Sequence, residues 1–343
     1  MQYINDVSIN EAVIHVLDNN SDEVIFDDIG LTLSDETYEY ILRHVKRCLK
    51  DEELKYAVFN SERNKVKELG EEYLSGKGGL IPVSKELASQ LFAIMKSKGN
   101  VPSCDLLVVS ISTEYGPMLS ILKMDYVKNY THSIDVVEDK VGINIIPQFI
   151  GLPSSGQRIQ KCAFLKPASD DKFDLMVIDK QPKKEDEDYG SNYFVGNYLN
   201  CTIISNERDL TKSFVKAAEK WTQSNLKDNA DEAEKIRSSI KRKLKEDDTI
   251  DVEQFSQEIF NGNEEASQNF SQFVKEQGVQ EKVDVDKQWV ETKLNRIRLK
   301  IDKDIDIYIN TEAYNDSSRF EITRNGDGTI NMIIKHVRNY IEK

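Results

Sequence analysis

The sequence predicts an α+β fold: a mixed N-terminal α/β-containing domain, then a helical region that closes with an antiparallel β-sheet. Strand-like and helix-like apolar patterns are interspersed over the first 180 residues, whereas helical patterns dominate from about Glu207 to Gly278 and strand patterns return after them. The 343 residues are enough for two domains with buried cores. We therefore expect domains at 1–180 and 193–343, with the charged stretch QPKKEDEDYGSN at 181–192 as a linker or loop.

The N-terminal elements follow from the spacing of apolar residues. Val7–Leu17 alternates and then becomes continuously apolar, which is typical of a strand entering a core, and EVIFDD is expected as its hairpin partner. Ser34 can cap a helix that runs to about Lys50, and two further helices are expected at about 62–74 and 83–98. Four more strands are predicted from the runs CDLLVVSIST, GPMLSILKMDYV, KCAFLKP and FDLMVIDK.

The C-terminal domain is expected to begin with a short strand, predicted from the apolar run YFVGNYLNC. An amphipathic helix follows from about Glu207, and three more helical stretches complete the region to Gly278. The segment DKQWVETKL predicts another helix. The closing antiparallel strands are predicted from RIRLKI, IDIYIN, SRFEIT and TINMIIKHV.

Charge is distributed unevenly along an acidic chain. The sequence has 46 Lys and Arg against 60 Asp and Glu, a formal net charge of -14, which taken alone argues against binding to nucleic acid. However, residues 201–245 contain 11 basic and 7 acidic residues, whereas 246–292 contain 3 basic and 13 acidic residues. The acidity is therefore concentrated elsewhere, and a positive surface can form locally.

Basic residues recur at three- and four-residue steps on three predicted helices, and they alternate with apolar residues along one predicted strand. Such cationic faces can follow the phosphates of double-stranded DNA. The alternative is an ordinary solvated surface. The candidate DNA-binding residues are Arg43, Lys46, Arg47 and Lys50; Lys212, Lys216 and Lys220; Arg237, Lys241, Arg242 and Lys245; and Arg296, Arg298 and Lys300.

The motifs of catalysis and of metal or cofactor binding are not matched. In TRNGDGTINMII, Thr323 and Ile334 stand where a calcium loop needs Asp and Glu, so the stretch predicts a hairpin turn. In GEEYLSGKGG, Gly78 stands where a phosphate-binding loop needs Ser or Thr, which predicts a loop between helices. The four cysteines and four histidines lack zinc-ligand spacing. We therefore predict no enzyme, no catalytic residue, no cofactor and no metal.

Two isolated polar features are assigned structural roles. The triplet Glu291-Thr292-Lys293 is loosely similar to a nuclease strand, but it lies in a predicted helix. His15 lies inside an apolar strand, where a hydrogen-bonded core histidine is expected rather than a general base.

The start of the sequence, MQYINDVSINEAV, has neither the basic nor the apolar region of a signal peptide. No apolar run approaches the roughly 18 residues that span a bilayer. These features predict a cytoplasmic protein with reduced thiols that does not bind membranes.

The order of segments resembles the bacterial nucleoid-associated protein family of the NdpA/YejK type. The resemblance begins with VSINEAVIHVLDN and LTLSDETYEYILRHVKRCL, includes the strand pair LLVVSISTEYGPMLSILKM, and is best in NYFVGNYLNCTIISNERDLTKSFVKAAEKW. It continues through FSQFVKEQGV to INMIIKHV and so covers nearly the full chain. Order and spacing carry the resemblance, since none of these motifs is catalytic.

The resemblance implies a nucleoid location and binding to double-stranded DNA, largely without sequence specificity, in chromosome organisation. It allows type II topoisomerases or other nucleoid proteins as partners, and a homo-oligomer. Two alternatives stay open. One is a protein-interaction scaffold for DNA-processing enzymes with little DNA contact, which the acidic composition favours, and the other is a metal-dependent nuclease, which rests only on abundant carboxylates.

Overall fold

The structure is a computed structural model that describes residues 1–154, 157–168, 172–180, 192–294, 296–301 and 304–339. The chain forms two compact units: residues 2–204 form the first, and residues 205–343 form the second together with Met1. The predicted division into domains at 1–180 and 193–343 stays a prediction, and the predicted linker lies outside the described residues apart from Asn192. Antiparallel sheets combine with helices in the chain, which confirms the α+β class.

The first unit is built on a seven-stranded antiparallel sheet with the order β1-β3-β4-β7-β8-β2-β9. Its long central pair is β3 and β4, joined by a tight turn at Tyr115, and β1 pairs with β3 over almost its full length. The strands are β1 (Val7–Leu17), β2 (Lys55–Phe59), β3 (Cys104–Thr113), β4 (Gly116–Asp125), β7 (Lys161–Leu165), β8 (Leu175–Asp179) and β9 (Cys201–Ile204).

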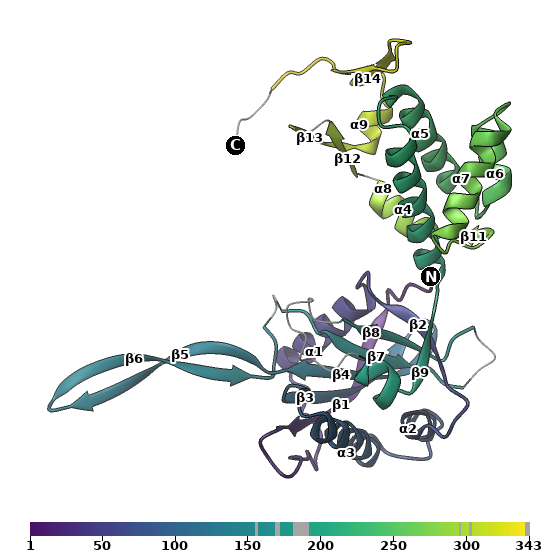
Figure 1. The fold of residues 1–343 in the computed structure, drawn as a ribbon. Helices are drawn as coiled ribbons and strands as arrows, with labels where there is room; N and C mark the ends of the chain where they lie inside the picture. The colour runs from purple at the N-terminus through teal and green to yellow at the C-terminus, as the bar shows by residue number, and fades with distance from the viewer. Residues whose placement is uncertain (155–156, 169–171, 181–191, 295, 302–303, 340–343) are drawn as a thin grey trace. The chain divides into compact units, whose positions relative to one another are not determined.

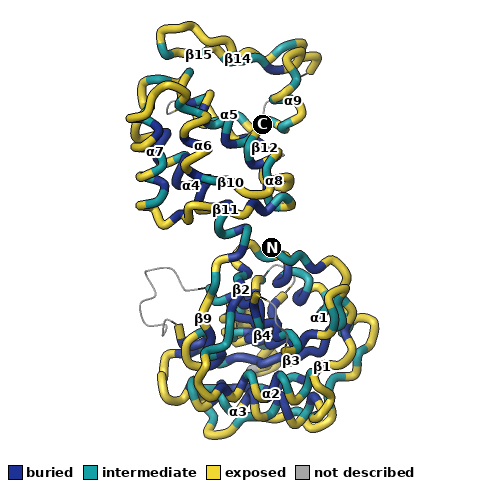
Figure 2. Tube along the Cα trace, turned by 90° about the vertical axis from the view of Figure 1, so that its right-hand side faces the viewer, coloured by how far each residue is buried: buried dark blue, intermediate teal, exposed yellow. Residues whose placement is uncertain are grey.

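Helices cover both faces of this sheet (Figure 1). The helices α2 (Lys65–Leu74) and α3 (Leu80–Lys98) pack on one face, and α1 (Asp35–Leu49) packs on the other. Strands buried on both faces are continuously apolar rather than alternating, which explains runs such as CDLLVVSIST. Figure 2 shows the buried residues concentrated along these strands. The Ser34 hydroxyl caps α1 by accepting a hydrogen bond from the Thr37 backbone, as predicted.

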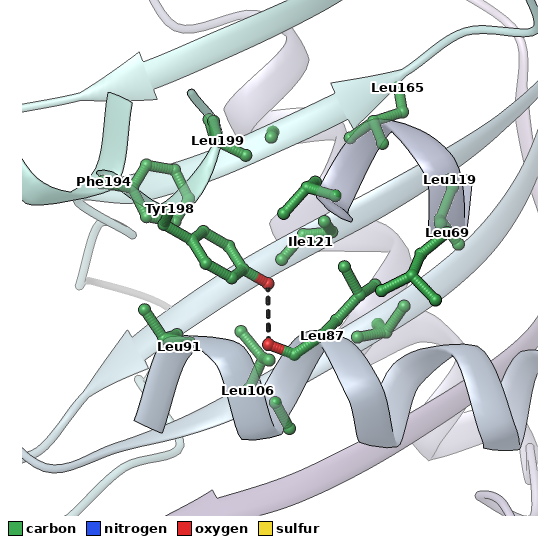
Figure 3. Close-up of a cluster of buried hydrophobic side chains, with 14 of the residues drawn as sticks. Leu69, Leu87, Leu91, Leu106, Leu119, Ile121, Leu165, Phe194, Tyr198 and Leu199 are labelled. Atoms are coloured by element: carbon green, nitrogen blue, oxygen red, sulfur yellow. Dashed lines mark hydrogen bonds between the residues drawn. The ribbon is translucent and has the colours of Figure 1, made fainter. Parts of the chain in front are cut away.

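The predicted strand at YFVGNYLNC is wrong in its first part. Tyr193–Tyr198 forms a short π-helix, η1, in which the Leu199 amide donates to the Phe194 carbonyl five residues earlier at 2.8 Å. A strand would send adjacent aromatics to opposite sides, whereas here Tyr193, Phe194 and Tyr198 are all buried. The Tyr198 hydroxyl donates to the Leu87 carbonyl of α3 at 3.2 Å within the apolar cluster of Figure 3. The sheet strand begins only at Cys201.

The N-terminal unit differs from the prediction in three other places. EVIFDD forms only an isolated bridge, in which Ile25 and Val16 exchange two backbone hydrogen bonds of 3.0 Å on the edge of β1 that β3 leaves open. The strand β2 was not predicted, because it is short. A long hairpin was also missed: β5 (Val127–Val137) and β6 (Lys140–Ile150) pair in register and extend away from the sheet (Figure 1).

The second unit begins with a helical region that matches the prediction. Phe214, Trp221, Phe255 and Phe270 form its buried aromatic core, with edge-to-face contacts between ring centroids 5.2 to 5.7 Å apart. The short strands β10 (Thr249–Asp251) and β11 (Lys282–Asp284) pair beside it. The helices are α4 (Glu207–Asn225), α5 (Ala230–Glu246), α6 (Val252–Ile259), α7 (Glu264–Glu276) and α8 (Lys287–Leu294).

The predicted closing strands form two separate antiparallel hairpins. The first joins β12 (Arg296–Ile301) to β13 (Ile305–Asn310), and the short helix α9 (Thr311–Asn315) leads from it to the second, which joins β14 (Phe320–Arg324) to β15 (Ile330–Ile334). The second hairpin is docked on α5. Its Arg324 pairs with Asp231 and Glu234, and its Gly328 carbonyl accepts from the Ala230 amide at 2.9 Å.

Candidate nucleic-acid interface

Helix α5 carries four of the predicted DNA-binding residues. The Asn229 side chain caps it by accepting a hydrogen bond from the Glu232 amide at 3.1 Å. One face is buried at three- and four-residue steps through Ala233, Ile236, Ile240 and Leu244. The remaining positions include the basic residues, which therefore lie on the borders of the buried face and on the solvent side.

A cavity of about 250 Å³ lies between α5, β12 and α9. Three of the predicted cations line it on one side, spaced along about one turn of the helix. Neutral hydrogen-bonding groups and one apolar side chain complete the wall, and one carboxylate is present. The lining residues are Ser238, Lys241, Arg242, Lys245, Glu246, Ile297, Thr311, Tyr314 and Asn315.

Lys241 is the least solvated of these cations. Its ammonium nitrogen lies 4.9 Å from the centroid of the Tyr314 ring, which offers a cation–π contact. Burial lowers the pKa of Lys241. The Glu234 and Glu219 carboxylates act against this shift, and the positive charges of Arg237 and Lys245 act with it.

Thr311 also lines the cavity. Within the described part of the chain, its buried Oγ1 has no hydrogen-bond partner. A buried polar atom without a partner costs on the order of 1–3 kcal/mol. The open part of the cavity thus combines cations with an aromatic ring, and the cations suit a phosphate group.

Arg237, the fourth predicted residue of α5, is held by an internal ion pair. Its Nε and Nη2 donate to the Glu219 carboxylate of α4 at 2.9 and 2.8 Å. The pair lowers the pKa of Glu219, although burial opposes that change. Arg237 therefore ties α4 to α5, and its availability for an external phosphate is reduced.

The lysine face of α4 is formed as the spacing predicts. Lys216 and Lys220 are exposed, and Lys212 is partly buried. Lys220 donates to the Gln277 side chain at 2.8 Å and lies 5.9 Å from the centroid of the Phe273 ring. The stripe is continuous, but its last lysine also packs against α7.

The basic strand β12 alternates as predicted, with Ile297 buried and Lys300 exposed. Arg298 forms a double hydrogen bond to Asp306 of β13, with both distances 3.2 Å, and its guanidinium lies 5.3 Å from the Tyr308 ring centroid. The side chain of Arg296 lies outside the described part of the structure.

The remaining predicted cations belong to the first unit. Arg43 on α1 and Lys50 at its C-cap are exposed, whereas Lys46 and Arg47 are half-buried in the last turn, where positive charge also stabilises the helix dipole. Arg47 donates to the Gln157 carbonyl at 2.9 Å. The structure thus brings Lys241, Arg242 and Lys245 to one cavity, and it places the α1 residues in a separate unit.

Sequence reasoning did not identify the neutral part of the cavity. Thr311 and Tyr314 come from α9, a five-residue helix within a region where only strands were expected. Neither residue belongs to a charged or periodic pattern. Only the three-dimensional docking of α9 beside α5 brings them to the cations.

The motifs that were assigned structural roles have them. The turn at TRNGDGT joins β14 to β15 with Gly326 and Gly328 at positive φ, and the Asp327 carboxylate accepts from the Thr329 amide at 2.9 Å. GEEYLSGKGG spans the end of α2 and the loop to α3. Glu291-Thr292-Lys293 lies exposed on α8. Among the described residues, no group of three acidic, histidine or cysteine side chains is arranged to hold a metal ion.

Fold and site together define a two-unit α+β protein whose second unit gathers cations around a cavity of about 250 Å³. The chain belongs to the family of the nucleoid-associated protein YejK, which it matches over residues 13–342, nearly its whole length. It therefore has a nucleoid-associated role, and the family is not a known family of enzymes. No curated protein matches the chain. In the described part of the chain, no helix is long and apolar enough to cross a membrane.

Proposed function

We propose that this protein binds double-stranded DNA, largely without sequence specificity, and so contributes to chromosome organisation in the cytoplasmic nucleoid. The observation that carries the proposal is the cavity lined by Lys241, Arg242 and Lys245. A backbone phosphate would accept hydrogen bonds from these three side chains. Because every phosphate is alike, such contacts position a duplex without reading its sequence.

The lysine face of α4 and the exposed cations of β12 and α1 are proposed as secondary contacts. Their contribution is expected to be smaller, since Lys220 and Arg298 already have protein partners. The segment 246–292, with 13 acidic and 3 basic residues, would repel DNA and so restrict the duplex to the basic side of its unit.

The test is the salt dependence of binding to a short random-sequence duplex across about 50 to 200 mM salt. Each phosphate contact contributes roughly 0.9 to the slope of log K against log salt, so Lys241→Gln/Arg242→Gln/Lys245→Gln should flatten the slope by roughly two to three units. An unchanged slope would remove the cavity from the interface.

A charge-matched control is available in the same unit. Lys235, Lys243 and Lys275 each pair with a carboxylate, at 2.7, 2.9 and 2.5 Å. Lys235→Gln/Lys243→Gln/Lys275→Gln removes the same formal charge but no cavity residue, so the slope should change by less than about one unit. Equal effects of the two triple variants would indicate general attraction rather than a site.

The α4 stripe is tested separately with Lys212→Ala/Lys216→Ala/Lys220→Ala. A flatter slope would place α4 in the interface, whereas an unchanged slope would make the stripe a solvated helix face.

A second candidate is a scaffold that binds a DNA-processing enzyme, such as a type II topoisomerase, with little DNA contact. The overall charge of -14 favours it. Absence of duplex binding even at low salt, together with a protein pull-down that survives nuclease treatment, would support the scaffold and overturn direct DNA binding.

A further inference from the structure

The β5–β6 hairpin has one strongly apolar face. The register pairs Tyr130 with Pro147, Ile134 with Ile143 and Val136 with Val141, so these residues share a face with Ile145 and Phe149. Seven large side chains on this face are between 61% and 78% exposed. They are Tyr130, Ile134, Val136, Val141, Ile143, Ile145 and Phe149.

The opposite face of the hairpin is mostly polar. Asn129 pairs with Gln148 and Ser133 with Asn144, and the Asn144 amide donates to the Asp135 carboxylate at 2.7 Å. The hairpin is therefore amphipathic, with one polar face and one apolar face. Among the residues that the structure describes, none covers the apolar face enough to bury these seven side chains.

The size of the apolar face fits a protein interface. The strands have 11 residues each, which gives a length of roughly 36 Å. Seven side chains that each expose on the order of 100 Å² give about 700 Å² per copy, close to the roughly 800 Å² per partner of a stable interface. An isolated two-stranded hairpin is at best marginally stable in water, so covering this face would also stabilise the hairpin.

Charges at the two ends of the hairpin indicate what covers the face. Lys128 lies at the base, where its ammonium sits 5.5 Å from the Tyr130 ring, and Glu138 and Asp139 form the tip in a turn with positive φ. The charged Lys140, next to the tip, is in register with the polar face. The apolar face itself carries a cation at one end and has acidic groups at the other.

We propose that two copies of this chain pair through the apolar faces of their hairpins, packed antiparallel about a two-fold axis near the His132–Ile145 pair. This arrangement places Lys128 of each copy opposite the acidic tip of the other, whereas a parallel arrangement would oppose like charges. It is also self-complementary, as a two-fold interface requires.

The hairpin is anchored so that it can present this face. The Tyr126 hydroxyl, between β4 and β5, donates to the Asp105 carboxylate of β3 at 3.1 Å. Gly151 follows β6 at the base of the hairpin. A Cβ added to Gly151 would lie 2.3 Å from both the Asp105 carboxylate and the Tyr126 ring, so only glycine fits there. The base of the hairpin is thus fixed to the sheet.

Sedimentation velocity of the full chain over about 1 to 100 µM tests the proposal. The wild type should sediment as a species of twice 39.4 kDa, and Ile143→Glu/Ile145→Glu should shift it to a monomer, with the dimer dissociation constant raised at least about 100-fold. The matched control Ser133→Glu/Asn144→Glu places the same charges on the polar face and should remain dimeric. A monomeric wild type at 100 µM, or a dimeric Ile143→Glu/Ile145→Glu variant, would overturn the proposal.

The antiparallel arrangement has its own test, which also detects a misfolded hairpin. Lys128→Glu should weaken the dimer, as should Glu138→Lys/Asp139→Lys. The combined triple variant restores opposite charges across the interface and should recover most of the affinity. Additive losses without recovery would overturn the antiparallel pairing.

Discussion

The buried histidine of β1 predicts a pH-dependent stability of the first unit. His15 is fully buried, its Nδ1 accepts a hydrogen bond from the Asp27 amide at 3.1 Å, and its Nε2 lies 2.9 Å from the Ser84 hydroxyl. The Ser84 hydroxyl donates its own proton to the Ile81 carbonyl at 2.9 Å, so Nε2 is the donor toward Ser84. The ring is therefore neutral, and a second proton on Nδ1 would face the Asp27 N–H.

Burial lowers the pKa of His15 from 6.5 to about 4. Because the unfolded chain binds the proton first as the pH falls, the stability associated with this shift is present above pH 6.5 and is lost as the pH falls toward 4. One pKa unit corresponds to about 1.4 kcal/mol, so the free energy of unfolding of the first unit should fall by about 3 kcal/mol over this interval.

The measurement compares the wild type with His15→Gln, which does not titrate but keeps a hydrogen-bonding group near Ser84. Both tryptophans, Trp221 and Trp289, lie in the second unit, so fluorescence does not report on β1. Hydrogen exchange of peptides from Val7–Leu17, corrected for the chemical exchange rate, reports on it directly. The wild type should lose protection from pH 7.5 to 4.5 more steeply than the variant.

Subtracting the two profiles removes the effect of other groups, including the buried His44, whose pKa is also lowered by burial. The difference isolates the proton at His15. Parallel profiles would refute the reasoning, because they would mean that the imidazole titrates equally in the folded and unfolded chain.

Three further expectations concern single side chains. Tyr198→Phe removes the hydroxyl that bonds the carbonyl of α3, and chemical denaturation should show a loss of about 1 kcal/mol in the first unit. Arg237→Ala leaves Glu219 without its bidentate partner, and the free energy of unfolding followed by tryptophan fluorescence should fall by about 1 kcal/mol at this partly exposed pair. Gly151→Ala should increase hydrogen exchange at the hairpin base, since the new methyl group would overlap the Tyr126 ring.

The sequence predicted the elements whose side chains follow a strict local rule. The boundaries of β1 match the predicted Val7–Leu17 because its apolar run is clear, and α1 begins at Asp35, directly after the predicted cap Ser34. The π-helix at Tyr193 escaped prediction for the opposite reason. Its buried aromatics follow the spacing of a π-helix. Because π-helices are rare, the apolar run was interpreted as a strand.

The β5–β6 hairpin could also have been predicted. Ile134, Val136, Val141 and Ile143 alternate with polar residues around an acidic two-residue turn, which is the pattern of a half-buried hairpin. The signal ends there. Alternation predicts that one face is apolar, but only the paired register and the exposed fractions of the side chains show that the described part of the chain leaves this face uncovered.

The cavity shows a different limit. The helical spacing of Lys241 and Lys245 is visible in the sequence, and so is the spacing of Arg237. Arg237 forms an internal ion pair because Glu219, 18 residues earlier in the chain, lies beside it on another helix. Charge spacing thus predicts a face, and packing decides which charges on that face remain open to a ligand.

DNA binding by the cavity and pairing through the hairpin together predict that the protein bridges two duplexes. A dimer presents two copies of Lys241, Arg242 and Lys245. When one subunit binds a duplex, the free cavity of the other subunit stays close to it and can bind a second duplex. Ile143→Glu/Ile145→Glu should therefore keep the salt slope for one short duplex but lose the ability to retain a second, labelled duplex on immobilised DNA. The cavity variant should lose both activities. Bridging that survives in the monomeric variant would show that a single chain holds two duplexes, and would separate DNA organisation from self-association.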